Sequence, residues 1–349
     1  MDTNKTTKPI IDEKIIDGLF NEIEKVIVEN RTKMTYQINN TLVNTYFHIG
    51  KIIVENEQNG NIRAEYGKDV LKNLSKKLTN KYGTGFSLSG LYNMRLFYIR
   101  YKNFQPLAGK LSWSHYCYLI YIEDDRERSF YEKECINSGW SKRELKRQID
   151  SLLFQRLLLS RGKNNIKEVY ELSKKGNEIS RPTDILKEPY VFEFLGIKED
   201  KPARETDLEK NLLHHLSSFL LELGKGFMYV GHQMRITLGD NTHYYVDLVF
   251  YNKILRSYVL IDLKTEKMKP EYVGQMNMYV NYYNSEVKDE FDQETIGIIL
   301  CAGKKDVTME YVLGGLSNKV FASTYTYYIP NREELINEVE RILSENLFN

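Results

Sequence analysis

The chain has 349 residues, of which 42% are hydrophobic and 28% charged, and its formal net charge is +1. This length and balance suit a globular protein of two domains and exclude a chain that is disordered throughout. The first fourteen residues lack the apolar core of a signal peptide and no later apolar run is long enough to cross a bilayer, so we expect a cytoplasmic protein without a membrane partner. Three widely spaced cysteines without C-x-x-C spacing favour neither a disulfide framework nor a zinc finger.

The first half of the chain has the periodicity of helices. From residue 10 to about residue 159, apolar residues recur at helical spacing, which predicts a bundle of roughly six helices. A Gly-Thr-Gly turn at residues 83–85 is typical of a helix end, and Ser87 or Ser89 can cap the helix that follows. Such a pair suits a helix-turn-helix or winged-helix module, and equally an ordinary helical hairpin. We predict that residues 1–161 form a helical domain for DNA binding or assembly.

Basic residues cluster in this half, although the whole chain is almost neutral. Residues 63–110 contain ten lysines or arginines against two acidic residues, and a second basic run begins at Lys142. For each residue, a solvated helix face is the alternative to contact with phosphate. The residues predicted to contact nucleic acid are Lys76, Lys77, Lys81, Arg95, Arg100, Arg143 and Arg147.

The pattern changes in the second half. Residues 162–205 are charged and contain three prolines, and we interpret them as a linker with one apolar docking segment, Tyr190–Leu195. The elements expected next are a helix at 206–224, strands at 227–237, 243–251 and 257–265, a helix at 270–283, a strand at 295–301, a short helix at 306–313, a strand at 319–329 and a helix at 332–347. This αβββαβ order with additions predicts an α/β or α+β domain, residues 206–349, built on a mixed sheet covered by helices.

Two carboxylates lie inside apolar strand-like runs of this domain. Asp247 is in one strand, and fifteen residues later Asp262-Leu263-Lys264 is in the next. Side chains alternate along a strand, so Asp262 and Lys264 project from one face, and a hairpin brings Asp247 beside them. Burying such carboxylates costs free energy unless a cation compensates it. The pattern therefore predicts a magnesium site that hydrolyses phosphodiesters, with Mn²⁺ as a substitute.

Lys264 would orient or deprotonate the attacking water, and the second role requires a lowered pKa. The alternative for Asp262 and Lys264 is a structural ion pair on an edge strand. Glu209 borders the apolar stripe of the preceding helix and could reach the metal, but Thr206 and Glu209 also fit a capping box. Gln275, on the helix after the Lys264 strand, could hold the scissile phosphate or the water, or be an ordinary surface glutamine.

The order of these residues resembles the PD-(D/E)xK nuclease superfamily, whose core is the restriction-endonuclease-like fold. More closely, the whole chain is similar to the YhcG family of bacterial proteins, which joins a helical domain to such a nuclease domain. The matching stretches are residues 46–51, 85–87, 94–98, 111–115, 140–141, 246–251, 261–264 and 274–276. The chain departs from the superfamily pattern in lacking a proline before Asp247 and in having Asp262 where glutamate is common.

The resemblance implies that Asp247, Asp262 and the main chain of Leu263 hold the metal, that Lys264 is catalytic, and that Glu209 and Gln275 assist. The leading hypothesis is a magnesium-dependent endonuclease acting on DNA, in which the helical half positions a duplex or a branched junction and the second half cuts. RNA is the alternative substrate, and a nucleic-acid-binding or assembly protein without turnover is the alternative function. Because cutting two strands with one site each favours a two-fold assembly, we expect a homo-oligomer, either a dimer or a larger assembly.

Overall fold

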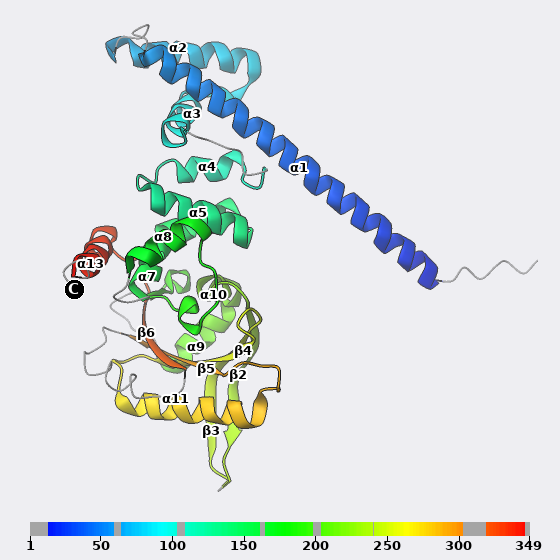
Figure 1. Cartoon of the computed structure of the whole chain (residues 1–349), viewed down its shortest axis with the longest axis vertical. Coiled ribbons are helices and arrows are strands. Elements are labelled where there is room, and N and C mark those ends of the chain that lie inside the picture. The colour runs from blue at the N-terminus through cyan, green and yellow to red at the C-terminus, as the bar shows by residue number, and fades with distance from the viewer. Residues whose placement is uncertain are drawn as a thin grey trace, which may run out of the picture. The chain divides into compact units, whose positions relative to one another are not determined.

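The computed structural model describes residues 13–58, 64–102, 109–160, 165–197, 204–239, 241–302 and 319–345 (Figure 1). The chain divides into two compact units, Met1–Glu123 and Asp124–Asn349. No described helix is both long and apolar enough to span a membrane.

All described secondary-structure elements of unit 1 are helices or helical turns. Its elements are α1 Glu13–Gln58, α2 Ala64–Tyr82, the 3-10 turn η1 Thr84–Phe86, α3 Leu88–Arg100 and α4 Trp113–Leu119. The C-terminal half of α1 packs on α3, and the two backbones approach so closely that a Cβ atom on Gly50 would lie 2.0 Å from the carbonyl oxygen of Met94. The described residues of this unit contain no strand, and therefore none that would form the wing of a winged helix.

The turn between α2 and α3 forms as the sequence predicts. Gly83 follows the last residue of α2 with φ 93°, a left-handed conformation that glycine adopts without strain. Ser87 is the cap of α3, because its hydroxyl oxygen accepts a hydrogen bond of 3.2 Å from the amide of Gly90. Trp113, the first residue of α4, packs on the rings of Tyr46 and Phe97 and so lies against the core of this unit.

Unit 2 begins with helices and continues into the sheet. Its helices are α5 Asp125–Ser138, α6 Lys142–Asp150, α7 Leu153–Ser160, α8 Asn165–Lys175, α9 Glu205–His214, α10 Leu216–Leu223, α11 Pro270–Tyr282 and α13 Arg332–Glu345, with 3-10 turns η2 Pro182–Ile185 and η3 Glu193–Leu195 and a π-helical turn η4 Tyr283–Val287. Its strands are β1 Tyr190–Val191, β2 Phe227–Thr237, β3 His243–Asn252, β4 Ser257–Lys264, β5 Ile296–Ala302 and β6 Val320–Thr326.

The six strands form one mixed sheet in the order β1-β6-β5-β4-β3-β2. The pairs β2–β3 and β3–β4 are antiparallel, and β4–β5, β5–β6 and β1–β6 are parallel. One face packs on α9 and α10 through residues such as Leu212 and Phe219, and the other packs on α11 through Met276 and Val280. Because both faces are covered, β5 is buried along almost its whole length. The predicted fold class, a helical N-terminal region followed by a mixed α/β sheet, is confirmed.

Two details differ from the sequence-based expectations, and a third cannot be compared. The helix expected at 206–224 is broken at His215, whose φ −106° and ψ 31° are not helical, so it becomes α9 and α10. Residues 165–197, expected as a linker, contain α8, and their apolar island supplies the edge strand β1, in which Tyr190 pairs with Tyr325 of β6. The short helix expected at 306–313 lies outside the described residues.

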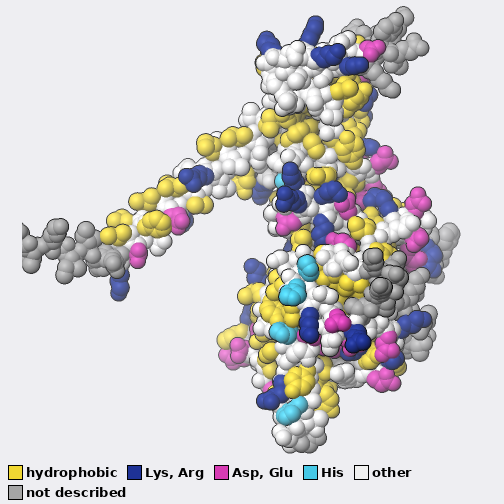
Figure 2. All heavy atoms as spheres, turned by 180° about the vertical axis from the view of Figure 1, so that it is seen from behind, with side chains coloured by type: hydrophobic (Ala, Val, Ile, Leu, Met, Phe, Trp, Pro, Cys, Tyr) yellow, Lys and Arg dark blue, Asp and Glu magenta, His cyan; other side chains and the backbone are white. Residues whose placement is uncertain are grey.

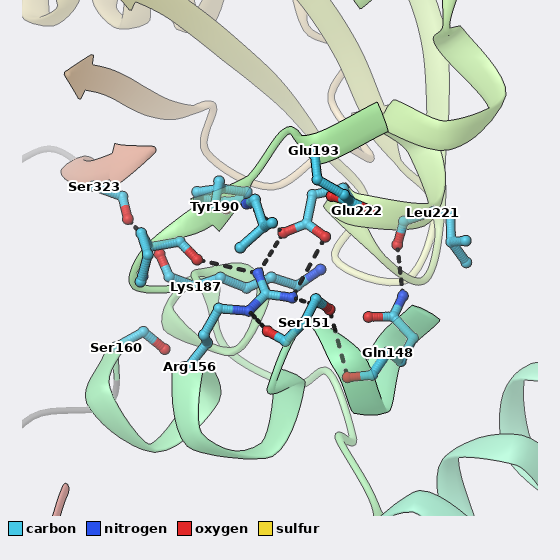
Figure 3. Close-up of polar contacts among 12 residues, drawn as sticks. Gln148, Ser151, Arg156, Ser160, Lys187, Tyr190, Glu193, Leu221, Glu222 and Ser323 are labelled. Atoms are coloured by element: carbon cyan, nitrogen blue, oxygen red, sulfur yellow. Dashed lines mark hydrogen bonds and ion pairs between the residues drawn. The ribbon is translucent and has the colours of Figure 1, made fainter. Parts of the chain in front are cut away.

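The helices α5 to α8 also belong to unit 2, whereas the sequence analysis extended the helical domain to residue 161. A buried network of charges explains why α6 and α7 join the sheet (Figure 3). Arg156 of α7 is fully buried and donates to Glu222 of α10, which is also fully buried. Arg156 donates 2.7 Å to the carbonyl oxygen of Ser151 and 3.1 Å to that of Pro189.

Arg147 of α6 completes this network and is thereby removed from the surface. Its guanidinium donates to Glu193 at 2.7 Å and to Glu222 at 3.2 Å, and only 17% of its side chain is exposed. The prediction that Arg147 contacts nucleic acid does not fit this position. These ion pairs could not be predicted from the basic run, because the two acidic partners lie 46 and 75 residues further along the chain.

Candidate active site

The candidate site lies where β3 and β4 separate. Their paired register ends at Leu248 opposite Ile261, and the next residue on each strand toward the site is a carboxylate, Asp247 or Asp262. The amide of Leu263 donates a hydrogen bond of 2.8 Å to Oδ2 of Asp247 in place of a bond to the neighbouring strand. The separation of the strands thus makes room for two carboxylates while keeping the backbone satisfied.

Lys264 lies directly against the buried carboxylate. Its Nζ is 2.9 Å from Oδ2 of Asp262, whose side chain is 3% exposed, and 3.9 Å from Oε2 of Glu205 on α9. The same ammonium group lies 5.2 Å from the centre of the Tyr272 ring, which α11 contributes from the other face of the sheet. Lys264 is therefore held as a cation among two carboxylates and an aromatic face.

Burial and charge shift the pKa values of this pair. Burial, followed by the charge of Asp247, raises the pKa of Asp262 to about 7 although Lys264 opposes the shift. Burial on its own would lower the pKa of Lys264, but the negative charges led by Asp262 outweigh it, and the pKa is raised. Burial alone therefore does not give Lys264 the lowered pKa that a general base needs, and a cation bound between the carboxylates would have to provide it.

Glu209 reaches the site from α9. The capping box expected at Thr206 does not form, because α9 begins at Glu205 and Thr206 is already inside it. Instead Oε2 of Glu209 accepts a hydrogen bond of 2.8 Å from Nε2 of Gln233, while Oε1 is buried without a hydrogen-bond donor among the described residues. Burial raises the pKa of this carboxyl, and the charge of Asp247 adds to the shift.

Gln233 joins Glu209 to Asp247 and was missed by the sequence analysis. Its Nε2 also donates to Oδ1 of Asp247 at 3.2 Å. Gln233 has φ 47°, a left-handed conformation that costs a non-glycine residue roughly 1 kcal/mol. It lies on β2 shortly after a bulge between Tyr229 and Gly231. A glutamine in an alternating edge strand gives no sequence signal for this role.

Gln275 is positioned by a tyrosine of the same helix. Its amide nitrogen donates to the hydroxyl of Tyr279, one turn further along α11, and that hydroxyl donates 3.1 Å to the carbonyl oxygen of Tyr245 on β3. The pKa of Tyr279 is raised by burial and then by Asp262 and Asp247, which puts this hydroxyl within the field of the site. Gln275 is thus half-buried beside the site.

The basic residues predicted to contact nucleic acid fall into two groups. Lys76, Lys77 and Lys81 are exposed on α2, where Figure 2 shows Lys and Arg side chains along one edge of unit 1. Arg143 is also exposed, on α6 of unit 2. Arg95 and Arg100 pair with carboxylates, the first with Glu57 at 2.8 Å and the second with Glu123 at 3.3 Å.

Within the described residues, no three histidine, cysteine, aspartate or glutamate side chains are grouped closely enough to hold a metal ion. Protein side chains therefore offer at most two carboxylates at the strand separation, Asp247 and Asp262. Magnesium is commonly held by one or two carboxylates, with water and phosphate oxygen atoms completing the shell, so this donor set is compatible with magnesium and unsuited to a structural zinc ion.

The mixed sheet with Asp247, Asp262 and Lys264 at separating strands defines a nuclease domain of the PD-(D/E)xK class. Residues 183–340 match the family described as YhcG PDDEXK nuclease domain, and residues 22–156 match the DUF1016 N-terminal domain. The chain is 34% identical over 361 residues to "Putative nuclease YhcG" of Escherichia coli (strain K12), with 94% of each chain covered. The chain therefore belongs to the YhcG family, as the sequence resemblance implied.

A solved structure of a repair endonuclease from Pyrococcus abyssi is also similar to part of the chain. It shares 17% sequence identity, covers 36% of this chain and 49% of its own, and aligns with a TM-score of 0.26.

Proposed function

We propose that the chain is a magnesium-dependent endonuclease that hydrolyses phosphodiester bonds of DNA. The observation that carries the proposal is the meeting of Asp247, Asp262 and Lys264 at the point where β3 and β4 separate. Charges buried this deeply cost free energy in a sheet, and a cation bound with a nucleotide phosphate would compensate it. Membership of a nuclease family supports the same conclusion.

Asp247, Asp262 and the main-chain carbonyl of Leu263 are the groups proposed to hold the metal. The unsatisfied Oε1 of Glu209 supports a cationic or water ligand nearby, since a buried acceptor without a donor is rare in folded proteins. When bound, magnesium would polarise a phosphoryl oxygen and lower the pKa of a water molecule. Titration of activity against metal concentration would distinguish a mechanism with one ion from a mechanism with two.

The other side chains have proposed roles that follow from their contacts. Lys264, as a cation, would stabilise the negative charge that develops on the phosphoryl group. Gln275, fixed by Tyr279, would orient the phosphate or the attacking water through its amide. Glu209 and Gln233 would act on Asp247, because Gln233 donates to both carboxylates and so fixes their spacing.

The exposed lysines Lys76, Lys77 and Lys81 of α2, together with Arg143 of α6, support contact with the phosphate backbone. Arg95 and Arg100 belong to the same proposal, with Glu57 and Glu123 as competitors for their charge. Branched DNA remains our proposed preference and RNA the alternative substrate. We also propose a homo-oligomer, because a two-fold assembly presents one site to each strand.

The test is cleavage of a supercoiled plasmid, a four-way DNA junction and a matched RNA by the full chain, each with Mg²⁺, Mn²⁺ or EDTA. We expect nicked or linear products with either metal and none in EDTA. Asp262→Asn and Lys264→Met should each reduce cleavage by on the order of 10³-fold. Glu338→Gln on α13, where the side chain is 46% exposed, is the matched control. Salt-sensitive binding without product under any metal would instead establish a binding protein, and equal activity of Asp262→Asn and the parent chain would refute the site.

A further inference from the structure

The N-terminal part of α1 has a large apolar surface that no described residue covers. Every described side chain from Ile16 to Ile38 is exposed, and the rest of unit 1 first reaches the helix near its residues 36–39. In Figure 2 hydrophobic side chains follow the length of this helix. Exposed apolar patches of this extent mark interaction surfaces, and most of the stability of a helix in a protein comes from packing of its apolar face.

Five of the exposed apolar residues lie in a stripe with the spacing of a coiled coil, while other exposed apolar residues, such as Leu19 and Val28, lie outside it. Intervals of four and three residues separate Ile16, Phe20, Ile23, Ile27, Asn30 and Met34. Side chains at such intervals lie on one side of a helix and pack into the matching stripe of a second helix. Five of the six positions are apolar, with exposures between 45% and 61%. The stripe therefore fits a helix as its partner.

The stripe is symmetric about Lys25, which makes a second copy of the same helix its natural partner. In an antiparallel pair centred there, Ile16 meets Met34, Phe20 meets Asn30 and Ile23 meets Ile27 of the other copy. A two-fold axis requires this kind of self-complementarity.

The charges favour the antiparallel arrangement over the parallel one. Residues 14–24 carry a net charge of −2 and residues 26–36 a net charge of +1. The antiparallel pair places these segments against each other, whereas a parallel pair would place −2 against −2. The acidic segment also argues against an anionic membrane or nucleic acid as the occupant.

We infer that residues 16–34 of α1 form an antiparallel coiled coil with a second copy of this chain. The surface lies in unit 1, away from the nuclease sheet in sequence, and the inference deepens the proposed homo-oligomer without depending on cleavage. Its failure is distinguishable from that of the nuclease proposal, because mass in solution is measured without metal or substrate.

The first experiment measures the mass of the full chain by sedimentation over a wide range of concentration. We expect a dimer, and expect Ile23→Glu with Ile27→Glu to weaken it by at least about 100-fold, since charges would replace buried anchors. The matched control is Asn21→Glu with Thr32→Glu, which adds the same charge on the opposite side of α1. A thermal unfolding curve checks that unit 2 remains folded. A monomer at every concentration, or a dimer insensitive to the stripe variant, would overturn the inference.

The second experiment tests the direction of pairing by disulfide cross-linking. Phe20→Cys and Asn30→Cys are made separately in a Cys117→Ser background, since Cys117 is partly exposed whereas Cys135 and Cys301 are buried. An antiparallel pair should cross-link only when the two variants are mixed. Efficient cross-linking of Phe20→Cys with itself would indicate parallel helices and contradict the proposed arrangement.

Discussion

Unit 2 contains two clusters of buried charge that are satisfied to different degrees. In the network of α7 and α10, both oxygens of Glu222 accept hydrogen bonds from arginines, and Oε1 also accepts 3.1 Å from the amide of Val191. In the candidate site, Asp262 lies against one lysine and a second carboxylate, and Oε1 of Glu209 has no donor among the described residues. In the first cluster the carboxylate is fully paired by protein groups, and the unpaired atom among the described residues is on the cationic side, Nη1 of Arg147. In the second cluster a carboxylate oxygen is left without a donor.

The pKa shifts of Glu222 and Asp262 show the same difference between the two clusters. Glu222 is fully buried, and burial alone would raise its pKa, yet Arg156, Lys187 and Arg147 lower it to about 2. The pKa of Asp262 moves the other way, because one lysine does not offset burial and a neighbouring carboxylate. A fully paired charge holds elements together, whereas an incompletely paired charge is available for a ligand. Substitutions in each cluster test this difference between paired and incompletely paired charge.

The largest effect is expected at the incompletely paired cluster. Asp262→Asn and Lys264→Met should each reduce cleavage by on the order of 10³-fold, because the first removes a proposed metal ligand and the second removes the cation that would stabilise the phosphoryl charge. The stability of Asp262→Asn should be equal to or higher than that of the parent chain, since a buried carboxylate is removed. The measurements are initial cleavage rates and urea unfolding of the same samples. A large loss of stability in Asp262→Asn would show that this cluster is structural after all.

Substitution of Glu222 should have the opposite effect, a loss of stability rather than of cleavage. Glu222→Gln leaves Arg156 and Lys187 buried without their counter-charge, so we expect a loss of about 3–5 kcal/mol in the free energy of unfolding. Urea unfolding followed by circular dichroism measures it. Residual folded protein should cleave normally once corrected for the unfolded fraction. Unchanged stability would mean that the buried pair contributes nothing to the joining of α7 and α10.

Gln233 allows a finer comparison, because it contacts two carboxylates without carrying charge. Gln233→Ala should lower cleavage by about 10- to 100-fold, as is usual when a group that orients a metal ligand is removed. We expect a higher metal concentration for half-maximal activity and little change in stability, since the side chain is exposed. His243→Ala, an exposed change at the far end of β3, is the matched control. Identical metal dependence in the parent chain and Gln233→Ala would remove Gln233 from the site.

The smallest effect is a dependence of stability on pH. Because the pKa of Glu222 is about 2 in the folded chain and near 4.5 ordinarily, its contribution is fully present above about 4.5 and is lost as pH falls toward 2. The difference in unfolding free energy between the parent chain and Glu222→Gln should therefore shrink through that range. Unfolding curves at neutral and acidic pH measure it, and a difference that grows on acidification would contradict the assignment.

The strands and the charged residues on them could be predicted from the sequence, because the apolar pattern that indicates a strand lies within the strand itself. The apolar runs around Asp247 and Asp262 fixed β3 and β4 to within a residue or two, and alternation placed Asp262 and Lys264 on one face. The family resemblance added the roles.

The features that could not be predicted depend on contacts between segments that are distant in the sequence. The salt bridges of Arg147 join residues 46 and 75 positions apart, so this one residue of an otherwise exposed basic run was wrongly predicted to be at the surface. Gln233 owes its position to a bulge and a left-handed backbone, neither of which leaves a mark in an alternating strand. The break at His215 likewise has no local signal, since the flanking leucines continue the helical pattern.

The Arg156–Glu222 pair also determines where the chain can be shortened. A fragment starting at residue 162 would keep every strand and every candidate catalytic residue but would lose Arg147 and Arg156, leaving Glu222 in a hydrophobic interior with Lys187 as its remaining cationic neighbour. A fragment starting at Asp124 retains all of these partners. The autonomous nuclease module should therefore be longer than its sheet, with α5 to α8 as an integral part of it rather than an extension of the helical N-terminal half.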